Sequence, residues 1–142
     1  MLNIQARTMY RSNGLIDEFI MYGAAKDYSE FAETIQAVVN TGKSTCLKTD
    51  SDIQIEIMLD ASKEKELFTS LQNQNNEYFS MQEWEKRDRL KIIGCMSSLN
   101  ELHKFMLNVS ASGSGYSYIS EYSKTHSYSN YSPEWRLHVQ NT

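Results

Sequence analysis

Residues 52–59 read DIQIEIML, and this stretch decides the fold class. Isoleucine or leucine occupies every second position from 53 to 59, which is typical of a strand with one buried face. Residues 45–49 form a second short strand pattern, and Asp50-Ser51 lies between the two segments. The sequence therefore predicts a β-hairpin near the middle of the chain.

Toward the N-terminus, residues 2–10 alternate in the same way. Asn13-Gly14 favours the tight turn of another hairpin, which would return through residues 15–22. Apolar residues then recur at helical spacing after Asp27, which we expect to open a capping box with Glu30. Gly42 is expected to cap the end of that helix.

Toward the C-terminus, residues 62–74 have a weak helical pattern, and residues 90–96 are typical of a central strand. Ser98 and Glu101 predict a second capping box at the start of an apolar-faced helix. Residues 116–121 and 134–140 are expected to be strands. In the last strand we expect Trp135, Leu137 and Val139 to face the core, with Arg136, His138 and Gln140 outside.

Hairpins that alternate with helices predict an α+β fold: a mainly antiparallel sheet built from hairpins, with two or three helices packed on one face. The length of 142 residues predicts a single α+β domain over 1–142. The helix positions expected to be buried are Phe31, Ile35, Val38, Leu102, Phe105 and Met106.

Net charge and the lack of a long apolar run disfavour some classes of function. The net charge of −4 disfavours a general nucleic-acid binder and suits a basic protein partner. No apolar run approaches the roughly 20 residues of a membrane helix, and the first residues do not resemble a signal peptide, so a cytoplasmic protein is expected. Cys46 and Cys95 lie in apolar stretches and are interpreted as buried thiols.

Motifs for catalysis are weak. His103, His126 and His138 do not stand at metal-ligand spacing from one another or from a cysteine, so we expect no metal site and no cofactor. Gly42-Lys43-Ser44 resembles the end of a phosphate-binding loop, but Ala37 stands where that motif needs glycine. No catalytic residue is assigned, and the sequence favours a non-enzyme.

Residues 110–132, SASGSGYSYISEYSKTHSYSNYS, form a Tyr/Ser segment that holds five of the nine tyrosines. Tyrosine offers stiff contact area and serine offers adaptable hydrogen bonds, a composition typical of protein-binding surfaces. The alternative is that these tyrosines are ordinary strand residues. The predicted partner-binding residues, with acidic residues from 83–88 added, are Tyr116, Tyr118, Glu121, Tyr122, His126, Tyr128, Tyr131, Glu83, Glu85 and Asp88.

GSGYSYISEYS (113–123) and SPEWRLHV (132–139) resemble the tail of small acidic α+β immunity proteins of bacterial polymorphic-toxin and contact-dependent growth inhibition systems. LIDEFIMYG (15–23) shows weaker similarity. The resemblance implies a bacterial cytoplasmic protein that binds one cognate toxin domain, often a nuclease, and occludes its active site.

Two other functions remain open from the sequence. One is a small enzyme or ligand-binding protein with His126 or His138 in a cleft. The other is an oligomeric structural subunit that uses an exposed sheet edge. The sequence does not fix the oligomeric state.

Overall fold

The computed structural model describes residues 1–11, 14–63, 66–72, 87–119, 127–128 and 134–140. Nine strands and two α-helices lie in these ranges, so the α+β class is confirmed. In chain order the elements are β1 (Asn3–Arg11), β2 (Gly14–Gly23), α1 (Ala25–Thr41), β3 (Thr45–Leu47), β4 (Gln54–Leu59), the 3₁₀ turn η1 (Ala61–Lys63), β5 (Glu66–Gln72), β6 (Arg89–Gly94), α3 (Met96–Ala111), β7 (Gly115–Tyr118), β8 (Ser127–Tyr128) and β9 (Glu134–Val139).

The strands form two mixed sheets. Sheet A has the order β1-β2-β9-β7, and sheet B has the order β3-β4-β6-β5-β8. The predicted hairpins β1–β2 and β3–β4 are antiparallel, as are β5–β6 and β7–β9. The pairs β2–β9, β4–β6 and β5–β8 are parallel, so the strands form two mixed sheets rather than the one mainly antiparallel sheet that was expected.

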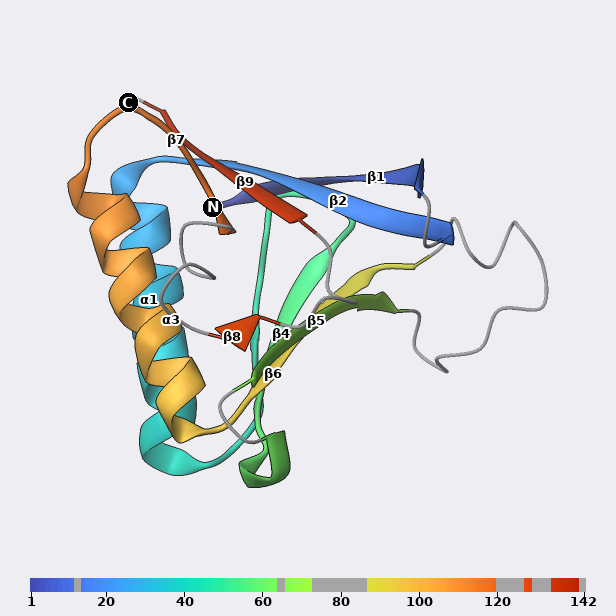
Figure 1. Cartoon of the computed structure of the whole chain (residues 1–142). Coiled ribbons are helices and arrows are strands. Elements are labelled where there is room, and N and C mark those ends of the chain that lie inside the picture. The colour runs from blue at the N-terminus through green and yellow to red at the C-terminus, as the bar shows by residue number, and fades with distance from the viewer. Residues whose placement is uncertain (12–13, 64–65, 73–86, 120–126, 129–133, 141–142) are drawn as a thin grey trace.

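Both helices stand side by side along one side of the molecule, with sheet A above sheet B beside them (Figure 1). One face of each sheet and the inner sides of the helices share a single apolar core. Its largest fully buried side chains come from both sheet A and α1, and include Trp135, Tyr28, Phe19 and Phe31.

The helix positions expected in the core are confirmed there. Phe31, Ile35, Val38, Leu102 and Met106 have no exposed surface, and Phe105 is half-buried against the core. The alternating isoleucines of residues 53–57 are buried as expected, and β6 is central in sheet B. The inward alternation of residues 134–140 is also confirmed, since Trp135, Leu137 and Val139 are all buried.

Both helices begin earlier than their predicted caps. Helix α1 starts at Ala25, and Asp27 is its third residue rather than its cap. Helix α3 starts at Met96 after Cys95, so Ser98 lies inside its first turn and is buried. The expected end of α1 is confirmed: Gly42 has φ of 71° and its N–H donates to the Val38 carbonyl at 2.8 Å.

Two interpretations of the sequence are wrong. Residues 66–72 form strand β5 rather than part of a helix, because Leu67, Thr69 and Leu71 are buried at alternate positions. A polar threonine in the middle of this inward face hides the alternation in the sequence. The cysteines are not buried thiols: Cys46 is exposed on the edge strand β3, and Cys95 is half-exposed before α3.

The turn between β3 and β4 ties the two sheets together. The Asp50 N–H donates to the Leu2 carbonyl at 2.7 Å, and the Asn3 side-chain amide donates to the Asp50 carbonyl at 2.8 Å. The Ile4 N–H donates to the Ser51 hydroxyl at 3.2 Å. These bonds cover the start of β1 along its outer edge.

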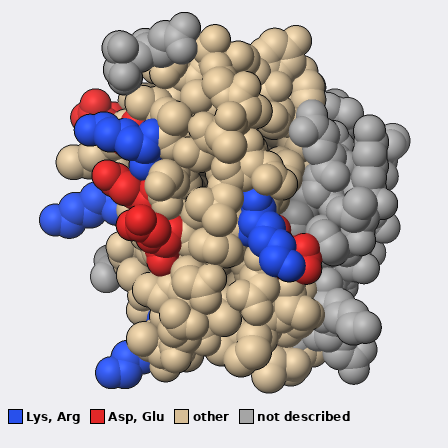
Figure 2. All heavy atoms as spheres, turned by 90° about the vertical axis from the view of Figure 1, so that its left-hand side faces the viewer, with Lys and Arg blue, Asp and Glu red and all other residues tan. Residues whose placement is uncertain are grey.

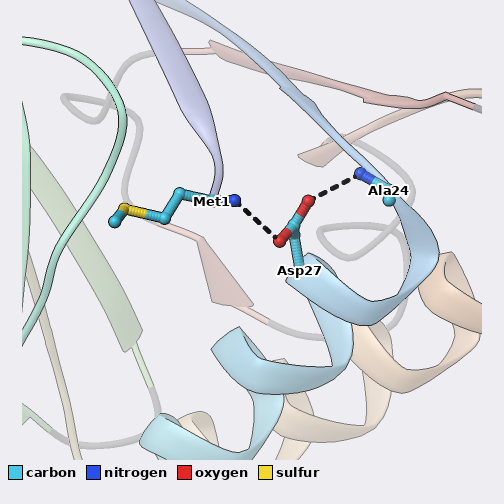
Figure 3. Close-up of polar contacts among 3 residues, drawn as sticks. All are labelled: Met1, Ala24 and Asp27. Carbon is cyan, nitrogen blue, oxygen red and sulfur yellow. Dashed lines mark hydrogen bonds and ion pairs between the residues drawn. The ribbon is translucent and has the colours of Figure 1, made fainter. Parts of the chain in front are cut away.

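A buried carboxylate joins the start of α1 to the N-terminus (Figure 3). Asp27 is 6% exposed; one oxygen accepts the Ala24 N–H at 2.8 Å, and the other lies 3.1 Å from the Met1 ammonium. Burial alone would raise the pKa of Asp27. The Ala24 hydrogen bond, the ammonium and Lys26 outweigh burial and hold that pKa below its usual value.

Candidate binding face

The outer face of sheet A carries a row of rings that runs across three strands. Strand pairing places Tyr22 of β2 beside His138 of β9, and His138 beside Tyr116 of β7. The residues that alternate with them on β2 and β9, such as Met21 and Leu137, are buried in the core. Since side chains alternate along a strand, Tyr22, His138 and Tyr116 share the outer face. We call these three residues the aromatic row.

The rings of the aromatic row contact one another. Tyr22 and His138 stack with centroids 4.9 Å apart and an interplanar angle of 28°. His138 and Tyr116 lie 5.3 Å apart with a tilt of 33°. Tyr118, two residues along β7, packs edge-on against Tyr116 at 5.6 Å. Such contacts favour these ring orientations in the free protein.

Tyr116 is the most exposed of these four rings. Tyr22, His138 and Tyr118 are half-buried, whereas Tyr116 is 60% exposed. A tyrosine this exposed leaves a large apolar area in water, although its neighbours limit its rotamers. It is thus a fixed aromatic surface at the rim of sheet A.

Helix α1 anchors the centre of the row from the core side. The hydroxyl of Tyr28, which is fully buried, lies 2.6 Å from the His138 carbonyl and 3.1 Å from the Met21 carbonyl. Burial raises the pKa of Tyr28 above its usual value of 10.0, so the hydroxyl keeps its proton and remains a donor. Next to His138, the Gln140 N–H donates to the Gly23 carbonyl at 2.8 Å.

The ring of His138 is held in its neutral form. Burial lowers the pKa of His138, and the positive charge of Arg136 lowers it further. Its Nε2 atom is buried without a hydrogen-bond partner among the described residues. Protonation would add a charge inside a stack of rings, which costs free energy. At neutral pH the centre of the row is therefore uncharged.

The charged side chains described on this face are of both signs. The Arg7 guanidinium pairs with the Glu18 carboxylate across β1 and β2. In the neighbouring strand β9, Glu134 and Arg136 also lie on the outer side. These four side chains carry both signs of charge, so we expect aromatic contact rather than one sign of charge to dominate recognition here.

The helix side of the molecule looks different. Figure 2 shows Lys and Arg side chains beside Asp and Glu in small mixed groups, with wide neutral areas between them. Met96 and Leu107 are its large exposed apolar side chains on α3, at 56% and 41%. The described parts of both helices show no cluster of rings like that on sheet A.

The structure separates the residues predicted as one site. Tyr116 and Tyr118 lie together on sheet A. Tyr128 lies in β8, which pairs with Leu67 on the edge of sheet B. Asp88 is exposed beside β6, also in sheet B, where its backbone bonds Gln72 and Gln54. The other predicted contacts lie outside the described residues: Glu83, Glu85, Glu121, Tyr122, His126 and Tyr131.

Three residues of the face were absent from the predicted set. His138 and Arg136 were expected to point outward, and their alternation in residues 134–140 was the available signal. No sequence signal marked Tyr22 as part of this face, because its place in the aromatic row depends on the parallel pairing of β2 with β9. That pairing joins segments from opposite ends of the chain.

Across the described ranges, no three His, Cys, Asp or Glu side chains gather in a way that could hold a metal ion. Neither described helix is long and apolar enough to cross a bilayer.

Comparison of the chain with protein families, curated proteins and solved structures finds no match.

Proposed function

We propose that this chain is an immunity protein that binds a cognate toxin domain, such as a nuclease, and neutralises it by covering its active site. The observation that carries the proposal is the aromatic row on sheet A, whose rings pack on one another and on Tyr118, with the exposed Tyr116 at its end. The sequence resemblance of residues 113–123 and 132–139 supplies the biological setting, which is the bacterial cytoplasm.

The aromatic row has the properties of a protein-binding surface. Tyrosine has few rotatable bonds, and here the neighbouring rings already restrict it, so binding costs little side-chain entropy. Residues that dominate binding energy are often tyrosines in the centre of an interface. Occlusion of an active site needs contact and shape, and no reactive group on the inhibitor.

Charge would act at longer range. The chain carries a net charge of −4, whereas the described side chains on the outer face of sheet A carry both signs of charge. A basic toxin would be attracted by the whole molecule and then held by aromatic contact. Salt should therefore slow association more than it accelerates dissociation.

A coexpression experiment tests this proposal. The candidate toxin is the C-terminal domain encoded by the gene directly upstream, expressed in bacteria with and without this chain. We expect arrested growth with the domain alone, restored growth with the chain, and a stoichiometric complex on copurification. A domain that stays toxic and unbound beside well-folded chain would contradict the immunity role.

Paired variants connect that test to the face. Tyr116→Ala should weaken the complex by about 1–2 kcal/mol or more, as expected for an interface anchor. Leu107→Ala removes an exposed apolar side chain from the helix side and should leave binding unchanged. Equal affinities in the two variants would place the interface elsewhere.

A further inference from the structure

His138 occupies the middle of the aromatic row, between two tyrosine rings. Tyr22 stacks on it from β2 with centroids 4.9 Å apart, and Tyr116 packs on it from β7 at 5.3 Å. The Nε2 atom of His138 is buried and has no hydrogen-bond partner among the described residues. A protonated imidazole carries two N–H donors, and the described surroundings offer the one at Nε2 no acceptor.

The charged groups described on the outer face of sheet A do not compensate a charge on His138. Glu18 and Glu134 lie four residues along their strands from the aromatic row, about 13 Å away, and Glu18 already pairs with Arg7. Arg136 is closer, two residues along β9, and its charge is positive. A proton on His138 would therefore be repelled on this face.

Helix α1 packs behind His138 on the core side of the sheet. The Tyr28 hydroxyl keeps its proton and donates to the His138 carbonyl at 2.6 Å. The Asp27 carboxylate accepts the Ala24 N–H and pairs with the Met1 ammonium. Neither group is directed at the imidazole ring, which lies on the opposite face of β9.

Helix α3 also contacts β9 from the core side. Its ionisable side chains have partners away from the aromatic row: Lys104 pairs with Glu101 at 3.4 Å, and the Nδ1 atom of His103 lies 2.8 Å from the Ala32 carbonyl. No described element thus presents a negative charge to the ring of His138.

We propose that His138 makes the edge of sheet A acid-sensitive: its protonation releases β7 from β9 and opens the aromatic row. Strand β7 has four residues, each paired with β9, and the packing of Tyr116 on His138 adds to this short ladder. Release of β7 uncovers one side of the His138 ring to water, where a proton is better solvated. The inference goes beyond the proposed function, because it concerns the chain without a partner.

Proton linkage determines the direction and the upper limit of the effect. With β7 in place, burial lowers the pKa of His138 below its usual value of 6.5, and Arg136 lowers it further. Release would return the pKa toward 6.5, so the closed form is favoured above that pH and loses ground as the pH falls below it. For one such group, the released fraction can rise by at most about thirtyfold from about pH 7.5 to about pH 5.

Amide hydrogen exchange of the purified chain at these two pH values tests the proposal. Protection factors, which correct for the chemistry of exchange itself, should fall about three- to thirtyfold at the lower pH for residues 115–118. Those of residues 55–57 in β4 should change by less and serve as the internal control. Unchanged or higher protection of β7 would overturn the proposal; higher protection is expected if the two tyrosine rings stabilise an imidazolium as a cation–π pair.

Two variants assign the response to one histidine. His138→Phe keeps an aromatic ring in the stack and cannot be protonated, so its β7 protection should not fall in acid. His103→Gln removes a histidine from the helix side and should respond as wild type. An acid response of His138→Phe equal to that of wild type would overturn the proposal.

An NMR titration of the His138 ring protons gives a second measurement that does not depend on exchange. We expect a midpoint below 6.5 and loss of the ring contacts with Tyr116 through the same transition. A midpoint at or above 6.5 would overturn the proposal. Because the chain is measured alone, rescue from a toxin without this acid response would refute the acid-sensitive edge and leave the immunity role standing.

Discussion

Replacing Tyr28 with phenylalanine tests how the fold fixes the aromatic row. The ring of Tyr28 is fully buried, and its hydroxyl lies 2.6 Å from the His138 carbonyl. Phenylalanine keeps the ring and removes the donor, so the His138 carbonyl loses the hydrogen bond from α1. We expect a loss of about 1–3 kcal/mol in the free energy of unfolding.

The loss can be measured in two ways. Urea unfolding gives the free energy directly, and a thermal melt should shift down by about 4 °C for each kcal/mol in a chain of this size. The matched control is Tyr116→Phe, which removes the same atom from an exposed ring and should change stability by less than about 0.5 kcal/mol. Equal stability of both variants would refute the idea that the Tyr28 hydrogen bond holds β9 in place.

Three further predictions concern other parts of the fold. Asp27→Asn should destabilise the chain at pH 7; because the folded pKa of Asp27 is lowered, this loss should shrink as the pH falls below about 4, which urea unfolding at several pH values would show. Gly23→Ala would place a Cβ 2.6 Å from the Leu2 side chain and 3.1 Å from that of Asp27. We therefore expect the free energy of unfolding to fall by about 1–3 kcal/mol, which a lower melting temperature would show. Cys46 should react with a thiol reagent in the native protein faster than Cys95; equal rates would contradict their different exposures.

Local patterns in the sequence predict much of the fold. The alternation in residues 53–59 and the cap at Gly42 each depend on neighbouring residues, and both agree with the structure. The hairpin expected around Asn13-Gly14 is present, but Gly14 already belongs to β2 and pairs with Arg11, and Asn13 lies outside the described residues. These features follow from backbone preferences and from one buried face per element.

Long-range pairing was not predictable in the same way. The parallel pairs β2–β9 and β4–β6 divide the strands into two sheets, and no local pattern marks which distant strands meet. Thr69 hid strand β5, because a polar residue on the inner face breaks the apolar alternation. The two helices begin earlier than predicted because their N-cap residues, Ala24 and Cys95, make no side-chain cap hydrogen bond that the sequence could reveal.

The candidate face shows the same division. Outward positions for Tyr116, Tyr118 and His138 follow from alternation along single strands. That they lie beside Tyr22 follows only from the strand order of sheet A, and that Tyr128 lies apart from them follows only from the pairing of β8 with β5 in sheet B. Composition therefore indicated tyrosine-rich recognition, whereas strand order determined which tyrosines can act together.

Titration calorimetry of the upstream toxin domain into wild type, Tyr116→Ala and Leu107→Ala tests the central claim most directly. We predict a one-to-one complex with wild type and with Leu107→Ala, and at least about tenfold weaker binding by Tyr116→Ala with its melting temperature unchanged. Wild-type affinity in a folded Tyr116→Ala variant would contradict the assignment of this face as the binding surface.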